Sequence, residues 1–436
     1  MLKILKALEI DKIFLRLKKY IFSTLWMLSE HTLRLFSAFF IGLWVARFLG
    51  VESFGIYSYV LAITAILSSV AKFGLDAVIV DFISRKKFET SAILVAGFWL
   101  RFLCSILILC IQYITIVFSG FEDHVTKYIF LISIAIVFYS FGVFEMYFEG
   151  VAKGKTIALC KILQLLLSAI LKVSLILNDS DLFYFILVSA FDIIFLNLAY
   201  FISYRFQNKN PLFSKFDYSI AKNLLNSAWP LILSSLFIMI YTRIDQIMLK
   251  YFLGFNEVGI YSAAVKISEL LYFWPVILTI GFFPAISRYK DISVKIYHQR
   301  LQLLYTFLIW SSLFIAVFWV ILSEKLILFL YGVEYSNASS ILQIHVWGLV
   351  FVSMGVISNR WLVSESMTTR SLYRTLLGAI MNIILNIFLI PSYGINGAAI
   401  ATLISQIFTT FLYDIFDPKM HFSLKQKIKA FRFAIK

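Results

Sequence analysis

The chain has 436 residues, of which 61% are hydrophobic and 14% charged, with a mean hydropathy of +0.89 and a formal net charge of +15. A water-soluble domain of this length needs far more polar surface, so the composition excludes that class of protein. The three cysteines show no CxxC spacing, and no Walker A, GxSxG or HExxH motif is present, so we expect no disulfide framework, metal site, cofactor or catalytic residue.

The first 20 residues are basic and amphipathic, and they lack the apolar region and cleavage site typical of a signal peptide. We predict a cytoplasmic helix along the membrane interface over residues 1–20. Uncharged runs then approach the ~20 residues that a helix needs to cross a bilayer, and the alternating pattern of a membrane β-barrel is absent. The sequence therefore predicts an all-α membrane protein of about twelve spans, near residues 21–47, 55–81, 91–118, 127–149, 158–177, 182–203, 221–249, 259–286, 301–322, 341–361, 371–391 and 396–416.

Basic residues gather at every second connection between these spans. They occupy residues 1–20, 85–87, 153–161, 205–222, 288–300, 360–374 and 419–436. The opposite connections hold only Arg47, Lys127, Lys250 and Lys325. Because basic loops stay in the cytoplasm, we expect both termini to be cytoplasmic. This topology also accounts for the net positive charge, so nucleic-acid binding is not needed to explain it.

A short motif occurs twice. Leu49-Gly50-x4-Gly55-Ile56-Tyr57-Ser58 recurs as Leu253-Gly254-x4-Gly259-Ile260-Tyr261-Ser262, at an offset of 204 residues. Both copies fall on the outer side of the predicted topology, and the repeated unit contains six spans. We therefore predict two parallel six-helix bundles related by a pseudo-twofold axis along the membrane normal. The N-lobe would cover residues 21–210 and the C-lobe residues 211–416, followed by a basic cytoplasmic tail over residues 417–436.

Three segments carry a family resemblance. Ala46–Ser58 resembles the first loop of polysaccharide-biosynthesis flippases of the O-antigen type, Asp245–Lys250 followed by Val258–Ile267 resembles their seventh and eighth spans, and Tyr393–Leu403 resembles their last helix. These proteins belong to the multidrug/oligosaccharidyl-lipid/polysaccharide exporter superfamily. The resemblance covers residues 20–416. One departure is Asp81, where the family often carries a basic residue, so we transfer no cation site to that position.

The resemblance implies a V-shaped, MATE-like transporter that works by alternating access in a bacterial inner membrane. Its cargo would be an undecaprenyl-pyrophosphate-linked oligosaccharide for O-antigen, lipopolysaccharide or capsule, moved from the cytoplasmic to the periplasmic leaflet. A polysaccharide polymerase and a chain-length regulator would be its partners.

Cations inside the spans are the candidates for binding such a cargo, because charges at membrane depth usually face a cavity or a partner and arginine binds phosphate with a two-pronged fork. The candidates are Arg34, Arg101, Arg243, Lys266 and Lys72. The alternative is local neutralisation on one helix face. Arg34 is four residues from Glu30, Lys72 four from Asp76, and Lys266 three from Glu269.

The acids inside the spans are candidates for coupling transport to protons or sodium ions. They are Asp76, Glu145, Asp192 and Asp245. Structural pairing is the alternative for each. Arg243 and Asp245 are two residues apart and do not share a helix face, so we expect this pair not to neutralise itself.

Two other functions compete with the flippase. A cation-coupled drug antiporter of the same superfamily would share the fold and the length. A membrane polymerase or glycosyltransferase would show a large outer loop with catalytic residues, whereas the longest predicted outer loop is the modest one over residues 323–340.

Overall fold

The computed structural model describes residues 2–119, 124–208, 216–290, 292–365 and 367–432, and nearly all of these residues are helical, with no β-strand among them. The α-helices are α1 (Leu2–Ala71), α2 (Asp76–Ser84), α3 (Thr90–Ser119), α4 (His124–Ile136), α5 (Val143–Gly150), α6 (Gly154–Leu177), α7 (Leu182–Gln207), α8 (Tyr218–Phe252), α9 (Phe255–Leu271), α10 (Phe273–Ser287), α11 (Val294–Tyr331), α12 (Ala338–His345), α13 (Gly348–Ser364), α14 (Thr368–Ile407), α15 (Tyr413–Phe416) and α16 (His421–Phe431). Shorter helical turns are η1 (Val137–Gly142), η2 (Arg288–Lys290), η3 (Val333–Tyr335), η4 (Phe408–Leu412, a π-helix) and η5 (Pro418–Met420).

Helices dominate because the chain is apolar along most of its length, and a helix satisfies its backbone polar groups without water. Ten helical runs of the described residues are long and apolar enough to cross a membrane. Two of them, Trp26–Ser84 and Thr369–Phe416, contain 59 and 48 residues. At about 1.5 Å per residue, each is long enough for two crossings of a hydrocarbon layer of about 30 Å. The chain is therefore a multi-pass membrane protein, and the count of twelve spans stays a prediction.

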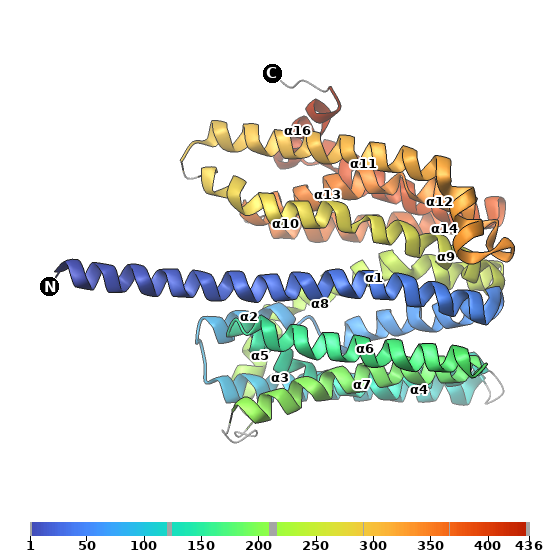
Figure 1. Ribbon diagram of the computed structural model, residues 1–436, viewed down its shortest axis with the longest axis horizontal. Coiled ribbons are helices and arrows are strands. Elements are labelled where there is room, and N and C mark those ends of the chain that lie inside the picture. The colour runs from blue at the N-terminus through green and yellow to red at the C-terminus, as the bar shows by residue number, and fades with distance from the viewer. Residues whose placement is uncertain (1, 120–123, 209–215, 291, 366, 433–436) are drawn as a thin grey trace. The chain divides into compact units, whose positions relative to one another are not determined.

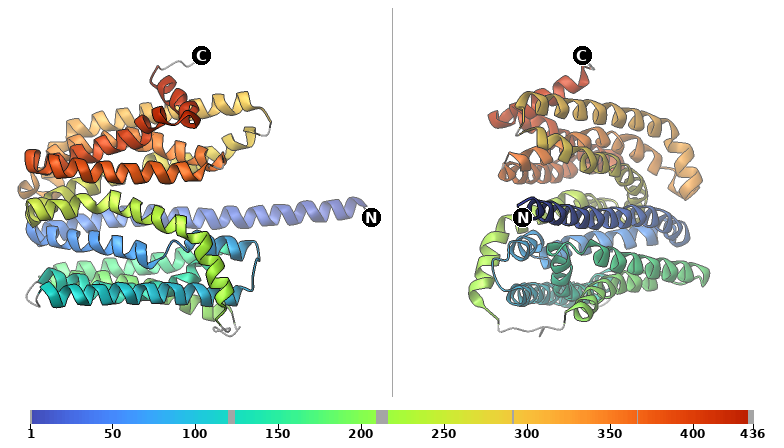
Figure 2. Two further views of the ribbon diagram at one scale, coloured as in Figure 1. Left: turned by 180° about the vertical axis from the view of Figure 1, so that it is seen from behind. Right: turned by 60° about the vertical axis from the view of Figure 1, so that its left-hand side comes forward.

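Glycines interrupt both long runs. Gly50 in α1 has φ of 72° and Gly394 in α14 has φ of 60°, which is the left-handed region where residues with a Cβ are disfavoured. Figures 1 and 2 show that the chain reverses direction within α1. Gly50 thus supplies the turn between the first two predicted spans.

The helices form two compact units. Unit 1 contains Met1–Val45 and Ile63–Leu236, and unit 2 contains Ala46–Ala62 and Phe237–Lys436. A buried apolar cluster that draws on α2, α3, α5, α7 and α8 forms the core of unit 1, and a second cluster that draws on α10, α11, α13 and α16 lies in unit 2. The predicted domain boundaries at residues 210 and 416 stay predictions, and the predicted polar connection over residues 205–211 lies partly outside the described residues.

The two copies of the glycine motif adopt the same conformation and contact each other inside unit 2. Gly254 has φ of 111°, in the same left-handed region as Gly50. A Cβ on Gly55 would overlap the carbonyl oxygen of Phe255, and a Cβ on Gly259 would overlap that of Val51. Since Val51 and Phe255 are also 204 residues apart, the contact is reciprocal. The glycine repeat therefore has a structural counterpart, whereas the relation between six-helix bundles stays a prediction.

Both terminal segments of the chain contain regular structure. Residues 2–20 are helical and continue into the first span within α1, and their placement in the membrane interface stays a prediction. At the other end, α16 lies against α11 in unit 2 (Figure 2) and buries Ser423, Gln426, Lys427 and Ala430. Much of the predicted basic tail is thus part of a folded unit.

Candidate functional site

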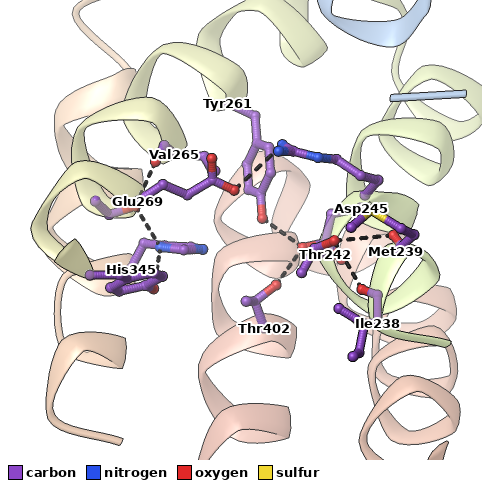
Figure 3. Close-up of polar contacts among 12 residues, drawn as sticks. Ile238, Met239, Thr242, Asp245, Tyr261, Val265, Glu269, His345 and Thr402 are labelled. Atoms are coloured by element: carbon purple, nitrogen blue, oxygen red, sulfur yellow. Dashed lines mark hydrogen bonds and ion pairs between the residues drawn. The ribbon is translucent and has the colours of Figure 1, made fainter. Parts of the chain in front are cut away.

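Asp245 of α8 lies in the centre of a polar cluster in unit 2. Only 4% of the residue is exposed. Oδ2 accepts a hydrogen bond of 2.7 Å from the Tyr261 hydroxyl of α9 and another from the Thr402 hydroxyl of α14. Oδ1 accepts one of 2.6 Å from the Asn386 amide, also of α14. Figure 3 shows Tyr261 and Thr402 converging on Asp245. Three helices therefore hold this carboxylate.

All three donors to Asp245 are neutral. Asn382 donates to the Thr402 hydroxyl at 3.4 Å, which leaves the Thr402 proton to donate to the carboxylate. Asn386 Oδ1 is buried without a hydrogen-bond partner among the described residues, and no ion pair to Asp245 is formed there. The cluster thus combines one carboxylate with amide and hydroxyl oxygens, the atoms that hard cations prefer.

The number of acids limits what this cluster can bind. Within the described parts of the chain, no group of three or more His, Cys, Asp or Glu side chains is placed to hold a metal ion. A single carboxylate among neutral oxygens suits a proton or a monovalent cation better than a tightly held divalent ion.

Arg243 pairs with an acid other than Asp245. Its guanidinium lies 3.4 Å from Glu269 of α9, and 31% and 37% of the two side chains are exposed. Lys266 lies over the Phe54 ring, with 4.3 Å between the ammonium and the ring centroid. Arg243 thus reaches Glu269 from the neighbouring helix, and the predicted local pair of Lys266 with Glu269 stays a prediction.

A second buried polar network lies beside the Asp245 cluster. The Ser268 hydroxyl is 2.8 Å and the Tyr272 hydroxyl 3.3 Å from His345 Nδ1, and Gln406 donates to Tyr272 at 3.4 Å. The rings of His345 and Tyr261 are 6.4 Å apart, edge to face. This network joins α9, α12 and α14 with neutral hydrogen bonds.

The predicted cations of unit 1 each have a partner within that unit. Arg34 contacts Glu30 at 3.2 Å, as the local-pair alternative predicts, and 42% of the Arg34 side chain is exposed. Arg101 is only 2% exposed and pairs with Asp76. Lys72 lies over the Tyr139 ring at 4.9 Å.

The predicted local pair of Lys72 with Asp76 is wrong because the two residues are not on one helix. The helix α1 ends at Ala71, Phe73 and Gly74 adopt positive φ, and α2 begins at Asp76. This turn separates the two side chains.

The other two predicted coupling acids of unit 1, Glu145 and Asp192, each pair with a lysine of a neighbouring helix. Glu145 lies 2.8 Å from Lys161. Asp192 lies 3.3 Å from Lys172 and also accepts hydrogen bonds from Gln164 and Ser168, at 2.7 and 2.8 Å. The role of every predicted site residue in transport stays a prediction.

The sequence reading missed the neutral partners of Asp245, although two of them lie in segments singled out there. Tyr261 is part of the second glycine motif, and Thr402 is part of the segment Tyr393–Leu403. Asn382 and Asn386 are four residues apart in an apolar run. That spacing puts both amides on one face of the helix, a signal of a buried polar cluster.

Comparison with known proteins gives two family matches. The profile of a family described as polysaccharide biosynthesis protein matches residues 23–290, and that of a family described as MatE matches residues 230–388. A probable low-salt glycan biosynthesis flippase of Haloferax volcanii is 27% identical over 197 residues, 44% of this chain and 41% of that protein. The chain thus spans less than half the length of this curated relative.

Two solved structures are similar over nearly the whole chain. The lipid II flippase MurJ in an inward closed conformation gives a TM-score of 0.72 at 18% identity, covering 93% of this chain and 90% of MurJ. An inward-facing multidrug resistance MATE family transporter of the MOP superfamily gives 0.70 at 15% identity, covering 92% and 96%. At these identities the likeness concerns the fold alone, and it confirms the predicted all-helical, MATE-like fold.

Proposed function

Because this chain belongs to the polysaccharide biosynthesis protein family, whose profile covers residues 23–290, we propose that it is a flippase for a lipid-linked oligosaccharide. The cargo is an undecaprenyl-pyrophosphate-linked repeat unit of an O-antigen, a capsule or a similar glycan. The protein moves it by alternating access from the cytoplasmic to the periplasmic leaflet of a bacterial inner membrane, with both termini in the cytoplasm. A polysaccharide polymerase and a chain-length regulator act on the product. The family match carries this proposal.

The exposure of two arginines supports an anionic cargo. The side chains of Arg34 and Arg243 remain 42% and 31% exposed inside their spans, and each contacts one acid. An arginine that is paired on one side still has free N–H donors for a phosphate oxygen. Arg101, Lys72 and Lys266 then serve mainly to hold their own helices, through Asp76, Tyr139 and Phe54.

Asp245 is the proposed coupling residue. It is buried and held by three neutral donors, so a proton or a sodium ion would be its only countercharge among the described contacts. Binding or release of that ion changes the charge of a cluster that links α8, α9 and α14. Asp76, Glu145 and Asp192 are weaker coupling candidates because each already has a basic partner.

A cation-coupled drug antiporter is the second candidate. The MatE profile over residues 230–388, which includes Asp245, favours it. An antiporter for cationic drugs needs acids rather than arginines in contact with its cargo, so the two functions differ in the role of Arg34 and Arg243.

Deletion of the gene tests both functions at once. The flippase proposal expects undecaprenyl-linked repeat units to accumulate on the cytoplasmic face and surface polysaccharide to disappear. Complementation with the wild-type chain should restore the polysaccharide. Unchanged polysaccharide together with increased drug sensitivity would overturn the flippase in favour of the antiporter.

A further inference from the structure

Two cavities adjoin along the first part of α11 in unit 2. One has a volume of about 480 Å³ and is an apolar groove between α10 and α11, lined among others by Leu278, Phe282 and Phe307. The other has a volume of about 970 Å³ and lies between the start of α11 and α16. Arg300 and Leu303 line both. An apolar groove and a polar pocket thus meet at one arginine.

The larger pocket is cationic. Lys295, Arg300 and Lys429 line it, and no acid lines either cavity. None of these three side chains forms an ion pair within the described residues, whereas Arg300 lies over the Tyr289 ring at 5.5 Å. Three positive charges without acidic partners favour a bound anion, and basic pockets between membrane helices are typical sites for anionic lipid headgroups.

The wall that carries Lys429 is rigidly attached to the unit. Lys427, two residues earlier in α16, is fully buried and lies 2.7 Å from Asp414, with a 2.6 Å hydrogen bond to the Thr410 carbonyl of the π-helical turn. Trp310 of α11 donates to the Ala430 carbonyl at 3.1 Å. The pocket is therefore built from fixed helices and does not depend on a loose tail.

Two glutamines in the pocket wall have acceptor atoms to spare. Gln302 donates to the Gln426 carbonyl at 3.0 Å. The Oε1 atoms of Gln302 and Gln426 are buried without hydrogen-bond partners among the described residues, and Gln426 is only 8% exposed. A small rotation of either side chain would let it accept a hydrogen bond from a hydroxyl group in the pocket.

From these observations we infer that α10, α11 and α16 form a binding site for an anionic glycerophospholipid of the surrounding bilayer. The phosphate contacts Arg300, Lys295 and Lys429. Hydroxyls of a glycerol headgroup donate to the glutamine oxygens, and one acyl chain lies in the apolar groove. The site is at the ends of the predicted spans 259–286 and 301–322, the depth at which a headgroup meets its acyl chains. This inference is independent of what the protein transports.

The test measures lipid binding to the purified full-length protein in detergent, by native mass spectrometry, with phosphatidylglycerol and phosphatidylcholine of the same acyl chains. We expect a clear preference for phosphatidylglycerol. The double variant Arg300→Gln/Lys429→Gln should reduce that preference about twentyfold to thirtyfold. This estimate takes about fivefold in affinity for each basic residue near an anionic lipid surface. Arg288→Gln/Lys425→Gln is the matched control, because it removes the same charge from two exposed residues, one in η2 and one in α16, that line neither cavity.

A second variant tests the apolar groove. Ala285 lines it, and Ala285→Trp should reduce binding of phosphatidylglycerol while leaving the basic side chains in place. Equal binding of the two lipids by the wild type would overturn the inference. So would an equal loss in the control variant, which would indicate general electrostatic attraction. Tighter binding of undecaprenyl phosphate through the same residues would also overturn it, since the site would then belong to the cargo.

Discussion

Asp192 of unit 1 and Asp245 of unit 2 are both predicted coupling acids held by neutral donors, and within the described part of the chain only one of them has a basic partner. Each accepts hydrogen bonds from neutral side chains on other helices, but Asp192 also contacts Lys172 at 3.3 Å. Asp192 is neutralised by the chain itself. Among the described residues Asp245 has only neutral donors, so no basic side chain there balances its charge. The comparison teaches that the presence of one lysine separates a structural acid from a candidate coupling site.

The largest effect is expected at Asp245. Asp245→Asn keeps the shape of the side chain but removes its charge, so proton or sodium coupling should fail. We expect export to fall by at least about tenfold, the scale of a lost hydrogen-bonded charge. Flipping of a lipid-linked oligosaccharide in proteoliposomes, measured across sodium concentrations and pH values, checks this.

The control removes the corresponding group in unit 1 together with its lysine. Asp192→Asn/Lys172→Gln should retain most of the export and its ion dependence. If this double variant is as defective as Asp245→Asn, or if Asp245→Asn keeps ion-dependent export, the distinction between the two acids is lost.

The arginine pairs should separate function from stability. Arg243→Ala breaks a pair that is about one third exposed, which costs about 1 kcal/mol or less of folding free energy, yet export should fall. Arg34→Ala should also reduce export, but it leaves the buried Glu30 carboxylate without its partner, so its stability should fall by more than that of Arg243→Ala. Arg101→Ala empties a buried position and should lower the free energy of unfolding by about 2 kcal/mol or more. Thermal unfolding in detergent and the export assay measure the two effects, and wild-type export by both Arg243→Ala and Arg34→Ala would exclude the phosphate role.

The glycine contact inside unit 2 predicts a purely structural effect. Gly259→Ala places a methyl group against the carbonyl of Val51, which should cost about 1–3 kcal/mol through overpacking. Gly281→Ala is the control, because a Cβ there meets no atom within 4 Å. Equal melting temperatures for the two variants would contradict this prediction, because the helices that carry Gly259 and Val51 would then move apart without loss of stability.

The smallest effect is expected at Asp414 of unit 2, a buried acid that, unlike Asp245, pairs with a lysine, Lys427. Burial lowers the pKa of Lys427 from 10.5 to about 8. Because the unfolded form then binds the extra proton between about pH 8 and 10.5, docking of α16 should become more stable as the pH rises through that range. Hydrogen exchange of α16 at two pH values measures this. Lys427→Met should abolish the pH dependence, and a wild-type trend in the opposite direction would contradict the assignment.

Much of the architecture could be predicted from sequence, because apolar runs and basic loops are properties of single segments. The helical class and most of the helix positions follow from them. The cluster around Asp245 could be predicted only in part. The sequence shows Asp245 inside a predicted span, but its hydrogen-bond partners come from α9 and α14. One of them, Thr402, is 157 residues away along the chain. Such a contact depends on how helices pack, which periodicity does not reveal.

The wrong local pair of Lys72 with Asp76 shows the same limit. Spacing alone favoured this pair, as if the span were an isolated straight helix. In the folded chain a turn at Phe73 and Gly74 separates the two residues, and Glu269 likewise contacts Arg243 of another helix. Long charged side chains at membrane depth form ion pairs between helices as well as within one helix.

The reciprocal contact of Gly55 and Gly259 bears on how this gene can be recombined. Residues 46–62 belong to the same compact unit as the second half of the chain, so the natural point of division in the sequence is not a modular boundary. A chimera that exchanges residues 1–208 between two relatives would bring together glycine loops that had not evolved to fit. Exchanging residues 46–62 along with the second half should keep the matched surfaces together and give better-expressed hybrids.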